Sequence, residues 1–163
     1  MGRDPRGAVA IEFALLAIPL FMLLFGILET GLIFFGSSVL ERATAEGARL
    51  VRTGQAQAQN MTITQFHDYI CQQASVLLSC ANLQVDVESF TGFGSVVISD
   101  PIQNGQLDPN LNKYSIGVAG SIVLVRTFYT WDILSPILKP FFANLSNGQR
   151  LMTSSATFRN EPF

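Results

Sequence analysis

Few residues in this sequence have side chains suited to catalysis or metal binding. The single histidine, His67, follows Phe66 on a predicted helix, where a surface or core-edge position is far more frequent than a general base. The two cysteines, Cys71 and Cys80, cannot complete a four-ligand zinc site with one histidine. Neither a nucleophile elbow nor a phosphate-binding glycine loop is present. We therefore expect no catalytic residue, no metal, no cofactor and no enzymatic activity.

The cysteine pair allows two interpretations. Their spacing of nine residues places Cys71 and Cys80 on opposite faces of a continuous helix, since each residue turns a helix by about 100°. A disulfide therefore requires the helix to end before Cys80, which the following Ala81-Asn82 favours. In an oxidising compartment we favour the disulfide, and two buried free thiols are the alternative.

Glu12 is notable because it is a carboxylate near the start of an apolar run. From Ala8 to Leu40 the only charged residues are Glu12 and Glu29. A charged side chain at the centre of a spanning helix costs about 2.5–3.5 kcal/mol on insertion scales, and less near the interface. Glu12 lies only about 6 Å along a helix from Ala8, from where it can reach headgroups. The carboxylate alone therefore does not show that Glu12 has a functional role, and its sequence context is more informative.

Composition limits the classes of protein to which the chain can belong. Of its 163 residues, 13% are charged and 48% hydrophobic, and the formal net charge is −2. The mean hydropathy is +0.34. Intrinsic disorder requires low hydrophobicity and high charge, so this composition excludes it. A nucleic-acid partner is not expected, because the chain has no basic excess.

The apolar excess lies near the N-terminus and predicts one membrane span over about residues 8–29. A bilayer core of about 30 Å needs about 20 helical residues, and this stretch extends about 32 Å. A cleaved secretory signal is the main alternative, but its apolar region is only about 7–15 residues long. The nearest small-residue cleavage motif, Ala43-Thr44-Ala45, also follows a charged pair. A short basic head before a long folded tail favours a cytoplasmic N-terminus.

The helix is predicted to continue beyond the membrane, over residues 8–53, to a length of about 70 Å. Pro19 removes one backbone hydrogen bond within the span and is expected to kink or loosen the helix. The outer half should pack on the protein's own domain. Apolar or small residues recur there at helical spacing, at Phe35, Val39, Ala43, Gly47, Leu50 and Val51. Gly54 can cap the helix, and residues 54–61 are predicted to be a polar linker.

Residues 62–163 predict a small α+β domain. Thr62 and Gln65 fit a capping box at the start of a helix that runs to about Ser79. The expected strands form an antiparallel sheet of three or four strands packed on the helices. They are predicted over 83–88, 93–99, 114–129 and 150–159. The apolar loop from Trp131 to Phe142 is expected to cover the core rather than form an adhesive tip.

The run Arg6-Gly7-Ala8-Val9-Ala10-Ile11-Glu12-Phe13 resembles a prepilin cleavage site. In that family a prepilin peptidase cuts after the glycine on the cytoplasmic side, and a glutamate is the fifth residue of the mature chain. The resemblance implies that residues 1–7 are a leader, cut between Gly7 and Ala8. It also implies that Glu12 pairs with the new amine of a neighbouring subunit during assembly, and opposite charges attract strongly in a low dielectric.

Three further segments resemble the TadE-like family of minor pilins and pseudopilins of tight-adherence (Flp, type IVc) pili. They are residues 19–31, residues 45–49 and the C-terminal residues 158–163. Other type IV pilins begin their mature chain with phenylalanine and fit less well, and the Flp major pilins are much shorter. The resemblance implies a pilin-like α+β fold and a structural role in pilus assembly.

The expected partners follow from the resemblance. They are a prepilin peptidase, other pilins through the N-terminal helix, the inner-membrane assembly platform and membrane lipid. The expected location is the bacterial inner membrane with the domain in the periplasm, or an extracellular pilus after assembly. The alternative is an uncleaved single-span protein whose outer domain binds a ligand or partner.

Overall fold

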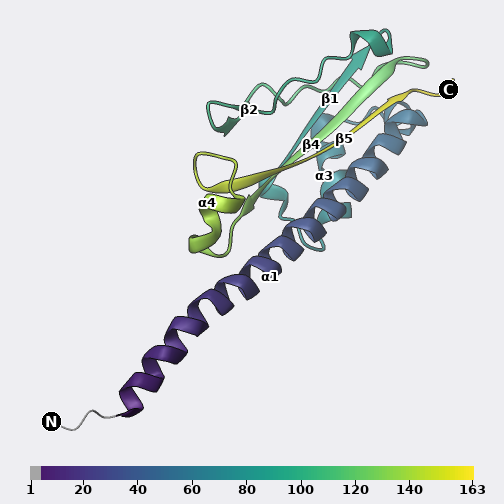
Figure 1. Cartoon of the computed structure of the whole chain (residues 1–163). Helices are drawn as coiled ribbons and strands as arrows, with labels where there is room; N and C mark the ends of the chain where they lie inside the picture. The colour runs from purple at the N-terminus through teal and green to yellow at the C-terminus, as the bar shows by residue number, and fades with distance from the viewer. Residues whose placement is uncertain (1–4) are drawn as a thin grey trace.

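The chain forms one long helix whose C-terminal half carries a small domain (Figure 1). The computed structural model describes residues 5–163, so residues 1–4 of the predicted leader lie outside it. The helices are α1 (Pro5–Arg52), α2 (Gln55–Ala58), α3 (Ile63–Ala74) and α4 (Lys139–Phe142), with short 3₁₀ turns at Cys80–Asn82, Phe93–Ser95 and Pro136–Leu138. The strands are β1 (Leu83–Phe90), β2 (Ile102–Gln103), β3 (Gln106–Leu107), β4 (Ile122–Asp132) and β5 (Gln149–Arg159).

The C-terminal half of α1 packs on the domain through one face. Its buried positions recur every three or four residues, as expected of a helix with one buried stripe. They include Glu29, Ile33, Gly36, Leu40, Ala43, Thr44, Gly47, Leu50 and Val51. The predicted packing face is thus confirmed from Ala43 onward, where its residues are buried. The prediction is wrong for Phe35, which is exposed, and Val39 is only half-buried.

The larger sheet has three antiparallel strands, as predicted, and their order is β1-β4-β5. Helix α1 contacts β4 and β5, and α3 contacts β1. Both helices therefore cover the same face of the sheet. Leu40, Phe66 and Val125 are fully buried between these layers. The α+β class predicted from sequence is confirmed.

The opposite face of the sheet contains a buried ion-pair network. Asp86 and Arg126 are cross-strand neighbours, and Arg126 donates to Asp86 Oδ2 from Nε at 3.1 Å and from Nη2 at 2.8 Å. Nη2 also lies 3.1 Å from Glu88 Oε1. Lys113 donates its backbone N–H to Asp86 Oδ1, and the side-chain hydrogen bond from Lys113 to Glu88 raises the pKa of Lys113. The alternating pattern predicts a half-buried strand, yet the segment between β1 and β4 covers Asp86 completely.

Helix α3 begins at the predicted capping box but ends earlier than predicted. Gln65 N–H donates to Thr62 Oγ1, and Thr62 N–H donates to Gln65 Oε1 at 2.9 Å. The helix stops at Ala74 rather than near Ser79. The chain can then turn back, which a continuous helix would have prevented.

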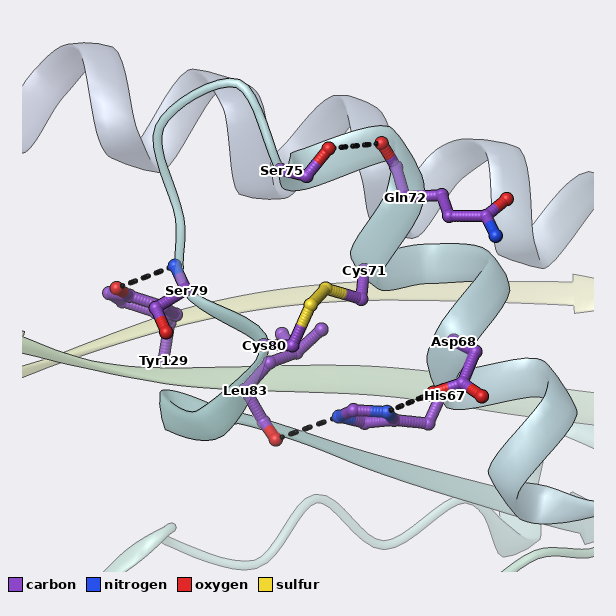
Figure 2. Close-up of a disulfide and its surroundings, with 9 residues drawn as sticks. All are labelled: His67, Asp68, Cys71, Gln72, Ser75, Ser79, Cys80, Leu83 and Tyr129. Atoms are coloured by element: carbon purple, nitrogen blue, oxygen red, sulfur yellow. Dashed lines mark hydrogen bonds and ion pairs between the residues drawn. A yellow bond between two sulfur atoms is a disulfide. The ribbon is translucent and has the colours of Figure 1, made fainter.

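This turn brings Cys71 and Cys80 together in a disulfide, with their Cα atoms 5.5 Å apart (Figure 2). The favoured interpretation of the two cysteines is therefore confirmed. His67 lies beside the disulfide, with Nε2 3.1 Å from the carbonyl oxygen of Leu83. Its partly exposed ring joins α3 to the start of β1, which is the core-edge position expected.

Three other local predictions are wrong. Residues 93–99 form a 3₁₀ turn and a loop instead of a strand. The strand predicted over 114–129 begins only at Ile122, because Gly117 and Gly120 have φ of +65° and +78° and interrupt any extended backbone. The linker over 54–61 contains the short helix α2, which starts directly after Gly54.

Candidate functional site

The N-terminal half of α1 is not covered by the other residues that the structure describes. From Val9 to Leu28 nearly every side chain is exposed, and this stretch projects away from the domain (Figure 1). Within the described part of the chain, α1 is the one helix long and apolar enough to cross a membrane. An apolar surface of this extent requires a cover, which lipid or other helices can provide.

The residues of the predicted cleavage site and Glu12 lie in this uncovered half. Gly7 and Ala8 belong to the first turns of α1, while the rest of the leader lies outside the described residues. Glu12 is exposed and makes no hydrogen bond or ion pair with any side chain that the structure describes. It follows Ala8 by four residues, so the two positions share one face of the helix. Among the side chains that the structure describes, none therefore competes with a partner from outside the chain for the Glu12 carboxylate.

A second acidic residue of the apolar run, Glu29, joins the helix to the domain. Its side chain is buried, with 3% of the residue exposed. Its carboxylate accepts hydrogen bonds from the backbone N–H of Leu134 at 3.2 Å and of Ser135 at 3.3 Å, and from Trp131 Nε1 at 3.5 Å. The sequence placed Glu29 at the outer interface of the span and missed this contact. No pattern in the sequence around Glu29 predicts this contact, because its partners lie more than 100 residues away in the chain.

Small residues bring α1 close to the domain at two places beyond Glu29. A Cβ atom at Gly36 would lie 3.2 Å from the ring of Trp131. At Gly47 it would lie 2.8 Å from Ile70, closer than van der Waals contact allows. Gly47 stands in one of the segments that resemble the TadE-like family, and here it lets α1 pack directly on α3. The position of the helix on the domain is thus fixed along its whole buried stripe.

Replacing Glu29 with alanine should loosen the junction between α1 and the domain. The backbone N–H groups of Leu134 and Ser135 would lose their acceptor, and a buried unpaired donor costs about 1–3 kcal/mol. In the full chain in detergent micelles, amide hydrogen exchange at these two residues should accelerate about tenfold or more. Glu41→Ala, which changes an exposed glutamate of the same helix, should leave their exchange unchanged. Equal exchange in Glu29→Ala and the parent protein would contradict the anchoring role.

The described residues offer no arrangement for metal binding. No three histidine, cysteine, aspartate or glutamate side chains among them could hold an ion together. The cysteines are joined in the disulfide, and His67 is engaged with Leu83 and Asp68. The features that stand out are instead an uncovered apolar helix, a carboxylate within it and a domain fixed at its outer end.

Comparisons with known proteins find a match for the N-terminal helix and none for the domain. The family model of TadE-like proteins matches residues 7–49. This match lies entirely within α1 and includes Gly7, Glu12 and Glu29, but not the C-terminal residues 158–163. No curated protein and no solved structure matches the chain. The family match thus confirms the TadE-like resemblance for the N-terminal helix, residues 7–49.

Proposed function

We propose that this protein is a minor pilin or pseudopilin, a structural and assembly component of a tight-adherence pilus. The observation that supports this most strongly is the exposed apolar half of α1. It contains Glu12, for which the described residues offer no partner, and it lies within the segment that matches TadE-like proteins. A helix of this kind can be held in a bilayer before assembly and can pack against other such helices in a fibre. Its domain needs no catalytic site for that role.

Processing by a prepilin peptidase after Gly7 is part of the proposal. The cut removes Arg3, Asp4 and Arg6 and leaves a positive amine on Ala8. Glu12 of one subunit then pairs with the Ala8 amine of the next, because either charge alone in an apolar environment is unfavourable. Before assembly the N-terminus faces the cytoplasm and the domain lies in the periplasm. The other partners are neighbouring pilins and the inner-membrane assembly platform.

The N-terminal sequence of the protein recovered from membranes tests this proposal. In cells that contain the peptidase we expect a start at Ala8, and in cells that lack it an unprocessed leader. Gly7→Leu should block the cut, because the cut in the family that this run resembles follows a glycine. The matched change Gly2→Leu, within the same leader but away from the cut, should leave the start at Ala8.

Two outcomes would contradict the proposal. An intact leader in the presence of the peptidase would favour the alternative, an uncleaved single-span protein whose outer domain binds a ligand or partner. A start near Glu46, just after the Ala43-Thr44-Ala45 motif, would identify the segment as a secretory signal instead.

A further inference from the structure

The loop between β4 and β5, residues 133–148, presents large apolar side chains to the outside. Leu134, Ile137 and Phe141 are 67%, 64% and 76% exposed. Their neighbours Ile133 and Leu138 are buried in the core, so the loop does cover the core as expected. Leu134, Ile137 and Phe141, in contrast, are left largely exposed by the residues that the structure describes.

This loop lies against the apolar part of α1, and two grooves are lined by both the loop and the helix. One groove, of about 520 Å³, is lined by Phe25 and Leu28 from the helix and by Leu134 and Pro136 from the loop. The other, of about 440 Å³, is lined by helix residues that include Met22 and by Phe141 and its neighbours. Figure 1 shows α4, which belongs to this loop, at the end of the domain where the uncovered helix emerges.

The loop therefore extends alongside the last turns of the predicted span and does not stop at its outer end. Phe141 shares a groove with Met22, which precedes Glu29 by seven residues. This corresponds to about 10 Å along the helix axis. If residues 8–29 of α1 lie in a bilayer, Phe141 lies at the depth of its outer leaflet, and Leu134, which shares a groove with Phe25 and Leu28, lies near the outer end of the span.

The charge of the loop suits a lipid interface. Between residues 133 and 148 the only charged side chain is that of Lys139, and no acidic residue is present. Lys139 is exposed and precedes Phe141 by two residues. A lysine flanked by apolar and aromatic residues is typical of elements that lie in a membrane surface, because the ammonium group reaches the phosphates while the apolar side chains enter the acyl region.

We infer that the β4–β5 loop is a second membrane contact of this protein. Leu134, Ile137 and Phe141 enter the outer leaflet beside α1, and Lys139 lies among the phosphate headgroups. The domain, which is already fixed on α1, is thereby held against the membrane at two points. This inference rests on the membrane span of the proposed function, and adds a contact that must be released when the subunit leaves the bilayer.

Nitroxide labels in the full-length chain can test the inference. Single cysteines are introduced at Phe141, Ile137, Ile18 and Val118; the disulfide-bonded Cys71 and Cys80 do not react with a thiol-specific label. The chain is reconstituted in vesicles of phosphatidylethanolamine and phosphatidylglycerol. Collision with oxygen, which concentrates in lipid, is compared with collision with a water-soluble nickel complex. Ile18 reports on the span, and Val118, 70% exposed at the opposite end of β4, is the matched apolar control.

We expect the oxygen-to-nickel accessibility ratio to exceed one at Ile18, Phe141 and Ile137 and to fall below one at Val118. A ratio below one at both loop positions, with Ile18 in lipid, would overturn the loop contact and leave the span intact. Protection of both loop positions from both reagents would overturn it in favour of a second copy of the chain covering the loop. A ratio below one at Ile18 would instead refute the span and with it the proposed function.

Discussion

Replacing Glu12 with alanine is expected to reduce the amount of assembled pili by more than about tenfold, while the protein remains in the membrane. Loss of one partner from an ion pair in a low dielectric costs about 3–5 kcal/mol, and each 1.4 kcal/mol changes an association constant about tenfold. Membrane anchoring should persist, because the change removes a charge from the apolar helix. Pili sheared from cells and subunits in the membrane fraction are measured separately.

Glu41→Ala is the matched control for this experiment, since Glu41 is an exposed glutamate of α1 beyond the span. It should leave pilus production unchanged. Glu12→Gln should behave like Glu12→Ala, because the amide keeps the size of the side chain but lacks its charge. Normal pilus production in Glu12→Ala would refute the assembly role of this residue. Loss of the variant from the membrane would show that Glu12 serves insertion rather than assembly.

The elements with a strong local signal could be predicted from the sequence. The sequence predicts helix α1 over residues 8–53, and the helix spans Pro5–Arg52. A continuous apolar run of bilayer length indicates its first half, and apolar or small residues at helical spacing indicate its second half. The capping box predicts the start of α3, and the strand predicted over residues 150–159 corresponds to β5. In each case the residues that determine the structure are close together in the chain.

The contacts that position the candidate site could not be predicted in this way. Glu29 is buried by Trp131 and its neighbours, which approach it only when β4 lies across α1. Asp86 looks like an ordinary exposed strand residue until Arg126 and the segment that precedes β4 cover it. Burial of a charged side chain depends on a distant partner, and periodicity along one strand carries no information about that partner.

Replacing Arg126 with methionine should lower the stability of the domain by about 3–5 kcal/mol, the largest loss we expect from a single substitution. Asp86 is fully buried and Arg126 donates two hydrogen bonds to its Oδ2. Methionine fills much of the same volume but leaves the Asp86 carboxylate without a cation, which is the unfavourable part of the change. Urea unfolding of the full chain in detergent micelles, followed by the fluorescence of Trp131, measures the free energy of unfolding.

Two further variants show whether the lost charge partner is the cause. Arg42→Met makes the same exchange at an exposed position of α1 and should change the stability by less than about 0.5 kcal/mol. Asp86→Asn combined with Arg126→Met should recover part of the loss, because the amide removes the buried charge while its oxygen can still accept from the backbone N–H of Lys113. If the double variant is no more stable than Arg126→Met, the packing of the guanidinium, including its position 5.7 Å over the Phe128 ring, is what stabilises this face of the sheet.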